Sequence, residues 1–206
     1  YVPDTGKFVE IFTFRKDTES DFRDARVEHD IKLLSVENNG DVDFMVYGYM
    51  NRGAHEGYSG VGIYHYNNDQ GAIEEQVFIP CTESFEFLQE DLGTLSYVNQ
   101  SGQLFIMIAG NLYQINIDEN TYEVLADHID SDDFGVSATN AHAAWKSESG
   151  DYAGQIEFID FDTMERRSIA PKASQKLDLL GFMNEDLVYG VVLDGDTLPN
   201  ATGYMI

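Results

Sequence analysis

A short strand-like motif occurs four times along this chain, and the repetition constrains the fold more than any other feature. Each copy alternates apolar or aromatic residues with other residues and ends in an aspartate, and the copies cover residues 11–17, 63–69, 112–118 and 156–162. The terminal aspartates Asp17, Asp69, Asp118 and Asp162 lie 52, 49 and 44 residues apart. This period is typical of solenoid and propeller repeats. The chain is therefore a repeat protein whose unit is built from strands.

The sequence around the motif predicts four strands in each repeat. We expect each copy to be followed by a turn and another strand, at residues 22–27, 73–79, 122–126 and 165–170. Two strands precede three of the copies, at 31–37 and 42–50, 94–98 and 103–108, and 135–138 and 141–147. A last pair, 177–182 and 187–193, leads to an apolar stretch at 203–206 that looks like the start of another third strand. Turns rich in Asn, Asp and Gly, such as 38–41 and 99–102, indicate hairpins between these strands.

A four-stranded antiparallel unit of this length, repeated in tandem, is typical of a β-propeller blade. The chain resembles the β-propeller repeat superfamily over nearly its whole length. The resemblance is architectural, because the signatures of WD40 and kelch blades and the Asp-box of sialidases are missing, so no functional residue can be carried over. We expect an all-β, propeller-like fold with four-stranded antiparallel blades. A two-sheet sandwich is the alternative fold.

The repeat also predicts how the chain is divided. We expect a single propeller-like domain over residues 1–206, with the outer strands of one blade in 1–30, full blades in 31–80, 81–126 and 127–170, and the start of another blade in 171–206. The stub at 204–206 would duplicate the third strand already supplied by 8–15, so we expect a larger ring and a longer chain rather than a closed four-bladed ring. Open sheet edges in such a segment would favour association with other chains.

The composition excludes several kinds of partner. The chain has 12 basic and 37 acidic residues and a formal charge of -25, which repels nucleic acid and anionic membrane surfaces. No apolar run is long enough to cross a membrane, so we expect no membrane insertion in this segment. Cys81 is the only cysteine, which excludes an internal disulfide and a thiolate metal cluster. We expect no cofactor and no metal, and an extracytoplasmic or cell-surface location.

Four aspartates open the innermost strands of successive repeats and are the first candidates for chemistry: Asp30, Asp91, Asp133 and Asp178. Carboxylates around a channel mouth could bind a cation, or supply the acid and base of a glycoside hydrolase. The alternative is a structural turn contact, because catalysis needs different roles at different blades whereas a turn contact repeats. The acidic stretch 127–135 lacks two ligands of an EF-hand, and a looser calcium site there stays open.

The loop at residues 51–60 is the second candidate, because the corresponding turn one repeat later is only 109–111. It is rich in glycine and carries Arg52, His55 and Tyr58. Arginine and tyrosine are favoured contact residues at interfaces, so we expect these three residues to bind a partner. An insertion without any partner is the alternative.

No catalytic residue can be named from the sequence. The five histidines show no His-Glu-x-x-His spacing, and no serine lies in a Gly-x-Ser-x-Gly elbow. The sequence therefore favours a non-enzymatic binding or scaffold module that recognises a protein or a glycan at a cell surface. The alternative is a carbohydrate-active enzyme that uses carboxylates at the channel mouth.

Overall fold

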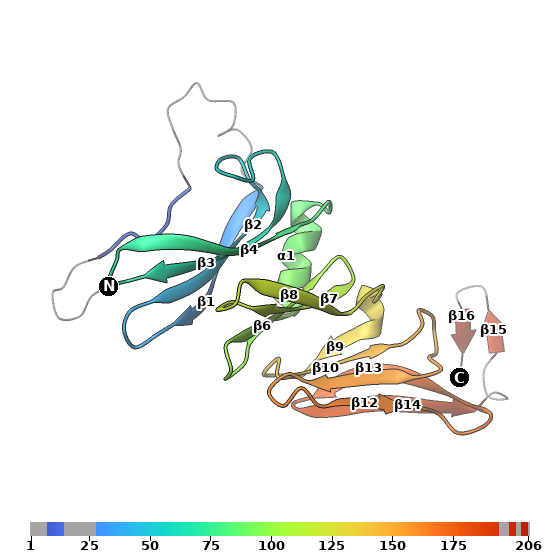
Figure 1. Cartoon of the computed structure of the whole chain (residues 1–206). Helices are drawn as coiled ribbons and strands as arrows, with labels where there is room; N and C mark the ends of the chain where they lie inside the picture. The colour runs from blue at the N-terminus through green and yellow to red at the C-terminus, as the bar shows by residue number, and fades with distance from the viewer. Residues whose placement is uncertain (1–7, 15–27, 194–197, 201–202, 206) are drawn as a thin grey trace. The chain divides into compact units, whose positions relative to one another are not determined.

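The computed structural model describes residues 8–14, 28–193, 198–200 and 203–205. The described residues form sixteen strands and one α-helix, which confirms the all-β expectation (Figure 1). The backbone divides into two compact units, residues 1–89 and 90–206. No helix in the described ranges is long and apolar enough to span a membrane.

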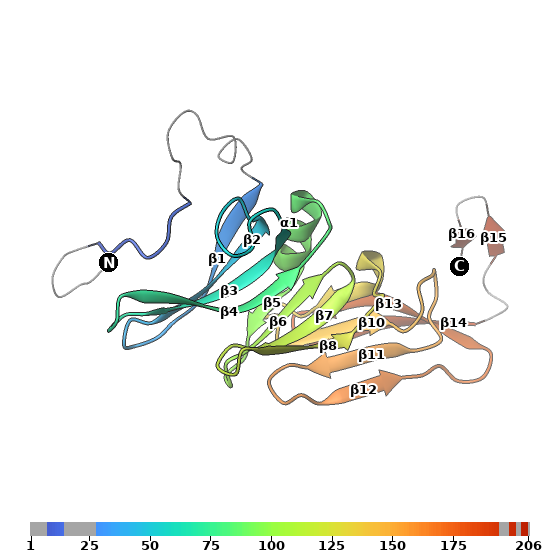
Figure 2. The same cartoon turned by 45° about the horizontal axis from the view of Figure 1, so that its top comes forward.

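Three sheets have four antiparallel strands each, arranged in the order of the chain. The first comprises β1 (His29–Val36), β2 (Val42–Tyr49), β3 (Ser59–Asn67) and β4 (Ala72–Pro80). The second comprises β5 (Ser96–Val98), β6 (Gln103–Ile108), β7 (Asn111–Asn116) and β8 (Thr121–Ala126). The third comprises β9 (Phe134–Val136), β10 (His142–Lys146), β11 (Ile156–Asp160) and β12 (Arg166–Ile169). Three copies of the motif thus form third strands, as predicted (Figure 2).

The turns between first and second strands repeat the same geometry in all three sheets. In each turn an N–H donates to the carbonyl oxygen three residues earlier at 3.0 Å: Gly40 to Glu37, Gly102 to Asn99, and Asn140 to Ser137. The donor residue has a positive φ in every case, at 92°, 74° and 62°. Glycine and asparagine are the residues that tolerate this left-handed conformation best, which explains why they occur there.

The turns between third and fourth strands are also equivalent, and the fifth position of the motif holds them. Its side-chain oxygen accepts a hydrogen bond from the backbone N–H three residues later: Asn67 from Gln70 at 2.9 Å, Asn116 from Glu119 at 3.1 Å, and Asp160 from Thr163 at 3.0 Å. Short Asn and Asp side chains suit this bond, because they reach the backbone of their own turn. The repeat in the sequence is therefore a repeat of turn chemistry as well as of strands.

Within the second unit, successive sheets pack face to face. The buried rings of Phe105 and Phe161 stack at 4.3 Å, and Trp145 belongs to the same cluster. The third sheet in turn contributes Ala144 and Ile156 to a cluster that contains Leu177 of the following hairpin. Each full sheet has a buried aromatic residue in its second strand, namely Phe44, Phe105 and Trp145. Tyr189, in the second strand of the following hairpin, is exposed.

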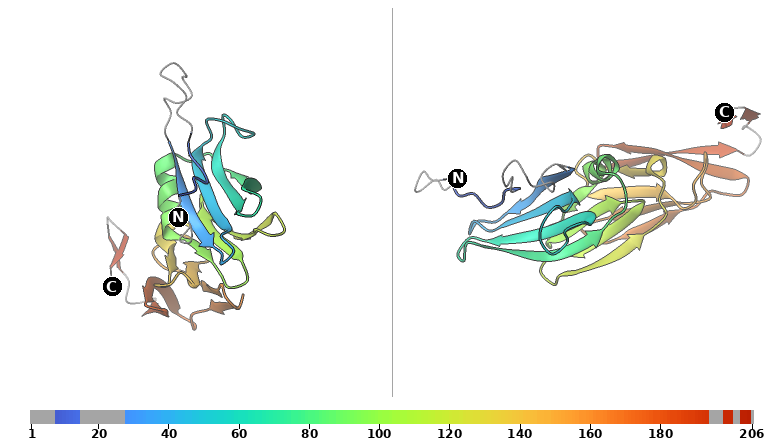
Figure 3. Two further views of the ribbon diagram at one scale, coloured as in Figure 1. Left: turned by 90° about the vertical axis from the view of Figure 1, so that its left-hand side faces the viewer. Right: turned by 90° about the horizontal axis from the view of Figure 1, so that it is seen from above.

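The pair of strands predicted at 177–182 and 187–193 is confirmed, whereas the pairing of the last strand differs from the prediction. β13 (Gln175–Met183) and β14 (Asp186–Leu193) form a two-stranded sheet, labelled in Figure 1 and coloured in the orange to orange-red range in Figure 3. β15 (Leu198–Asn200) and β16 (Gly203–Met205) form a second one. The apolar stretch at 203–206 therefore pairs with β15 over its described residues, and the expectation that it is a third strand beside β14 is wrong.

The first copy of the motif is only partly described. Residues 8–14 have no assigned strand, and the ring of Phe12 lies 5.5 Å from Phe44 and 6.4 Å from Tyr64 of the first sheet. The expected strand at residues 22–27 and the end of the one at 8–15 lie outside the described residues. The strand expected at 8–15 is thus absent over its described residues 8–14, and the strand expected at 22–27 stays a prediction.

A helix, α1 (Phe85–Thr94), occupies a segment that we expected to be loop up to a strand starting at Thr94. Ser84 precedes it, and its hydroxyl accepts a hydrogen bond from the N–H of Phe87 at 3.5 Å, as an N-cap does. Leu88, Leu92 and Leu95 follow at helical spacing, and all three are buried. The strand prediction failed at its first residues because this leucine pattern has a period of 3.6 rather than 2.

Candidate functional site

The glycine-rich loop joins β2 to β3 in the first unit and is closed by its own backbone. The N–H of Gly57 donates to the carbonyl oxygen of Met50, and the N–H of Met50 donates to the carbonyl oxygen of Tyr58, both at 2.8 Å. The N–H of Tyr58 donates to the carbonyl oxygen of His55 at 3.0 Å. Gly53 and Gly57 have φ values of 86° and 93°, which most other residues would adopt only with strain. The loop is therefore a compact, hydrogen-bonded turn.

His55 anchors this loop to the sheet. Its ring stacks on Phe78 of β4 with a centroid separation of 3.7 Å and an interplanar angle of 7°. Its Nε2 lies 2.7 Å from one carboxylate oxygen of Glu75, and the hydroxyl of Tyr64 donates to the other oxygen at 3.0 Å. Burial, and then the charge of Glu75, raise the pKa of Tyr64, so this hydroxyl stays a donor at neutral pH. His55 thus fixes the position of the loop.

Arg52 and Tyr58 lie in different surroundings. Arg52 lines a hollow of about 300 Å³, whereas Tyr58 is 63% exposed on the loop and does not line it. The rest of the lining comes from three aromatic-rich segments, with the residues Phe12, Thr13, Phe14, Val46, Tyr49, Met50, Asn51, Gly53 and Tyr64. The three residues predicted from the sequence therefore share one loop, but they do not converge on one pocket.

The lining of this hollow combines aromatic rings with one guanidinium. The rings pack on one another: Tyr64 stacks on Phe44 with a centroid separation of 5.5 Å, and Phe12 meets Phe14 edge-on at 5.2 Å. The guanidinium of Arg52 has several hydrogen-bond donors in a fixed plane. Binding pockets are usually lined by many apolar side chains and a few polar ones. Among the described residues that line this hollow, Arg52 is the charged one.

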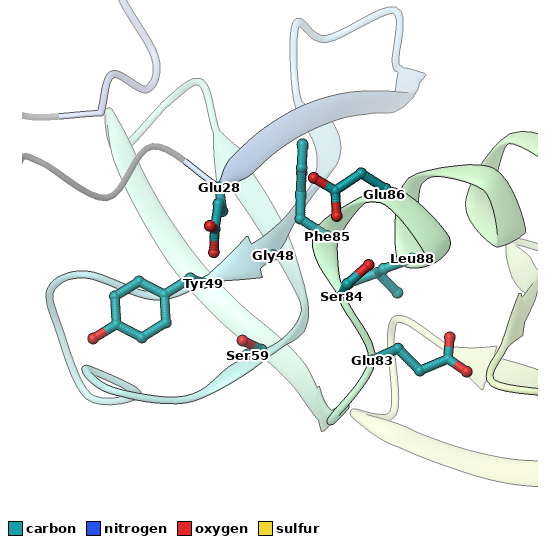
Figure 4. Close-up of a pocket in the computed structure, with 9 residues that line it drawn as sticks. All are labelled: Glu28, Gly48, Tyr49, Ser59, Glu83, Ser84, Phe85, Glu86 and Leu88. Carbon is teal, nitrogen blue, oxygen red and sulfur yellow. The ribbon is translucent and has the colours of Figure 1, made fainter.

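A second cleft of about 280 Å³ lies at the start of α1, in the first unit (Figure 4). Glu28, Tyr49 and Ser59 line one side, and residues 83–86 and Leu88 line the other. Gly48 lies between them with a φ of 107°, and a Cβ there would come within 2.3 Å of the carbonyl oxygen of Glu28. Sequence reasoning missed this cleft because it missed the helix, although Ser84 and the leucine spacing were the signal.

The carboxylates of this cleft do not form a metal site. The side chains of Glu28, Glu83 and Glu86 lie apart in Figure 4. Hydrogen bonds from its own backbone and from Ser84 lower the pKa of Glu86, as the start of a helix favours a negative charge. Across the described part of the chain, no group of three His, Cys, Asp or Glu side chains could hold a metal ion.

Two of the four repeated aspartates meet at one lysine. The Nζ atom of Lys146 lies 2.8 Å from Oδ1 of Asp133 and 3.6 Å from Oδ1 of Asp178. The other oxygen of Asp133 accepts a hydrogen bond from the N–H of Gly150 at 3.3 Å, and its side chain is buried. Buried charges of this kind are stable because they are paired and hydrogen-bonded. Asp133 therefore holds the chain around Lys146 and does not face solvent.

The other two aspartates also bond to the backbone. Oδ2 of Asp91 accepts a hydrogen bond from the N–H of Ala109, and Oδ1 of Asp30 accepts one from the N–H of Ile31, both at 2.8 Å. In the acidic stretch 127–135, the Asp130 side chain caps a short 3-10 helix, Ser131–Asp133, by accepting from the N–H of Asp132 at 3.1 Å. These contacts match the structural alternative that the sequence left open.

A histidine among carboxylates lies at the turn end of the first sheet. Nδ1 of His65 is 2.8 Å from Oδ1 of Asp43, and the Ser35 hydroxyl donates to Oδ2 of the same carboxylate at 2.6 Å. The bond to Asp43, and then the charges of Asp41 and Glu37, raise the pKa of His65. Because the serine bonds to the carboxylate and not to the imidazole, the three residues lack the nucleophile and base contact of a hydrolytic triad.

Cys81 is buried, and its sulfur accepts a hydrogen bond from the N–H of Glu83 at 3.4 Å. This contact belongs to the turn that leads into α1.

No protein-family model matches the chain, and no curated protein is significantly similar to it.

Proposed function

We propose that this chain is a non-enzymatic binding or scaffold module, built as part of a β-propeller and acting outside the cytoplasm at a cell surface. The observation that carries the proposal is the closed loop between β2 and β3, which presents Tyr58 to solvent and holds Arg52 beside an aromatic hollow. Rigid scaffolds with ordered, exposed loops are a common basis for recognition. The partner is a protein or a glycan, which Tyr58 contacts at the surface and Arg52 orients in the hollow.

The propeller part of the proposal rests on the repeat. Three sheets have the strand order of blades, and their two kinds of turn are equivalent from sheet to sheet. In the second unit each sheet packs on the next, as blades do around a channel. The ring itself, with its number of blades, is part of the proposal.

Binding can be tested with defined probes. We would screen the protein on an immobilised array of neutral and acidic oligosaccharides and on a phage-displayed peptide library, and then measure the affinity for the best binder of each. Tyr58→Ala and Arg52→Ala should each weaken that affinity by about tenfold or more, as for a contact residue of an interface. Tyr122→Ala is the matched control, because Tyr122 is 48% exposed on β8. Equal affinities for the wild type and both loop variants would contradict the proposed site.

The rival function is a carbohydrate-active enzyme that uses the repeated aspartates. Asp133 and Asp178 share Lys146 and are the nearest approach to the carboxylate pair that such an enzyme needs. Release of reducing ends from oligosaccharides by the wild type, and its loss in Asp178→Asn, would favour the enzyme. We expect neither, because both oxygens of Asp133 are already bonded to the protein.

A further inference from the structure

A polar pocket of about 360 Å³ lies on the second sheet, within the second unit. Its lining includes polar side chains from three neighbouring strands and from the turn between the last two of them: Gln103, Gln114, Asn116, Glu119, Thr121 and Glu123. Asn116 has Gln103 opposite it on one side and Thr121 on the other, and Gln114 lies opposite Glu123. Residues that are opposite each other, or two apart along a strand, share a face of the sheet. The five polar side chains of the strands therefore lie on one face.

The neighbouring third sheet does not fill this pocket. Phe105 lies opposite Gln114 on the same face, and its ring stacks on that of Phe161 at 4.3 Å. The pocket thus continues the face that packs on the third sheet, yet no residue of the third sheet, whose strands are all described, lines it. Tyr122 also borders the pocket, but its side chain points to the opposite face, where its ring meets that of Tyr113 edge-on at 5.9 Å.

The corresponding positions of the other two sheets are closed by charged side chains. The third residue of the motif is His65 in the first sheet, and its Nδ1 lies 2.8 Å from Oδ1 of Asp43. The fifth residue is Asp160 in the third sheet, and its Oδ2 lies 3.6 Å from Nε2 of His142. In the second sheet both positions are uncharged amides, so no ion pair between them closes the pocket.

The amides of the pocket have groups left over for a ligand. Nε2 of Gln114 donates to Oε1 of Gln103 at 3.2 Å, and Oδ1 of Asn116 accepts from the N–H of Glu119 at 3.1 Å. Among the described residues, no hydrogen bond uses Nε2 of Gln103 or Nδ2 of Asn116, and Oε1 of Gln114 is buried without a partner. A buried polar atom without a partner is costly and rare in folded proteins. Rotation of this side chain toward the pocket would let a ligand donor satisfy the oxygen.

We propose that the polar pocket binds a neutral oligosaccharide. Hydroxyl groups both donate and accept hydrogen bonds, so those of a sugar match amide donors from Gln103 and Asn116 and carboxylate acceptors from Glu119 and Glu123. None of the described lining residues is basic, and the chain has a formal charge of -25, so acidic sugars and phosphates are repelled. A protein partner would need an apolar centre, which these side chains do not offer. The site is separate from the loop at residues 51–60, which belongs to the first unit.

Isothermal titration calorimetry with defined oligosaccharides tests the choice of ligand. The neutral probes are cello-, malto-, xylo- and manno-oligosaccharides, with an oligogalacturonate as the acidic probe and a chitosan oligosaccharide as the cationic one. We expect a neutral probe to bind most tightly and the acidic probe not to bind. Failure of every neutral probe to bind, or tighter binding of the acidic or the cationic probe, would overturn the proposal.

Glu123→Ala tests the position of the site. It should weaken binding of the best neutral probe by about tenfold, because it removes a charged acceptor from the ligand. Glu74→Ala is the matched control and should bind like the wild type, since Glu74 lies opposite His65 in the first sheet as Glu123 lies opposite Gln114, and both glutamates are exposed. Wild-type affinity in Glu123→Ala would overturn the proposal.

The loop variants separate this site from the loop. Tyr58→Ala and Arg52→Ala should bind the neutral probe like the wild type. If they lose it while Glu123→Ala keeps it, the sugar binds at the loop, which would overturn the polar pocket and leave the function proposed for the loop standing.

Nuclear magnetic resonance gives a second readout that needs no substitution in the pocket. On addition of the best neutral probe, the side-chain amide signals of Gln103 and Asn116 should shift. Those of Gln70, which is exposed in a turn of the first sheet, should stay in place. Unchanged signals from both pocket amides in the presence of bound sugar would overturn the proposal.

Discussion

Asn99 connects a turn to the neighbouring sheet of the second unit. Its Oδ1 accepts hydrogen bonds from the N–H groups of Ser101 and Gln103, both at 2.9 Å, and its Nδ2 donates to the carbonyl oxygen of Phe161 at 2.8 Å. The side chain is buried. Removing it would leave buried backbone groups without partners, which is costly.

Asn99→Ala should therefore lower the free energy of unfolding by about 2–3 kcal/mol. Urea denaturation followed by circular dichroism would measure this loss. The control is Asn39→Ala in the corresponding turn of the first sheet, where the side chain accepts from the N–H of Asp41 at 3.0 Å but is exposed. There we expect less than about 1 kcal/mol. Similar losses for the two variants would contradict the role assigned to burial.

His65 should make the stability of the first sheet depend on pH. Its pKa is raised in the folded state, first by the hydrogen bond to Asp43. A raised pKa means that the stabilisation is fully present below the unfolded value of about 6.5 and is lost as the pH rises through the folded value. The difference in unfolding free energy between the wild type and His65→Gln should thus be larger at about pH 6 than at about pH 9. A larger difference at high pH would contradict the assignment.

At the scale of elements, α1 depends on its leucine face. Leu88 is fully buried, whereas Phe87, one position earlier in the same helix, is 63% exposed. Leu88→Ala should lower the free energy of unfolding by about 2–4 kcal/mol, because it leaves a cavity, and Phe87→Ala should change it by less than about 0.5 kcal/mol. Thermal and urea denaturation of both variants would measure this. Equal losses would show that the helix is not anchored by this face.

Most strands could be predicted from the sequence because their signals are local. Alternating residues and turns such as 38–41 and 99–102 fix β1, β2, β5 and β6 to within two residues. Pairing is not local, so the apolar alternation at 203–206 predicted a strand but not its partner β15. The helix was missed because the only element predicted near this segment was a strand starting at residue 94. The spacing of Leu88, Leu92 and Leu95 held the missing information.

The candidate site could be located from the sequence but not built from it. The length and glycine content of residues 51–60 mark an unusual loop. The partners of its side chains come from other strands, as with Glu75 and Phe78 for His55, and no spacing within the loop encodes them. The repeated aspartates show the reverse, because their recurrence reflects structural contacts such as the hydrogen bond that Asp91 accepts from the N–H of Ala109.

At the scale of the whole molecule, the proposed propeller requires the three full sheets to be successive blades of one ring. The turns between first and second strands offer one equivalent position in each of the three sheets. This position directly follows the first residue of the turn and is exposed in every case: Asn38, Gln100 and Ala138. In a propeller, equivalent points of successive blades lie on a circle around the channel. In a two-sheet sandwich they do not, because strands alternate between two stacked layers.

Pulsed electron paramagnetic resonance between spin labels at these three positions tests this most directly. Cysteines would replace Asn38, Gln100 and Ala138 in pairs, with Cys81 left in place because it is buried. The account predicts equal distances from 38 to 100 and from 100 to 138, and a distance from 38 to 138 that is longer than either but shorter than their sum. Two clearly unequal neighbour distances, or a distance from 38 to 138 shorter than either, would contradict the propeller.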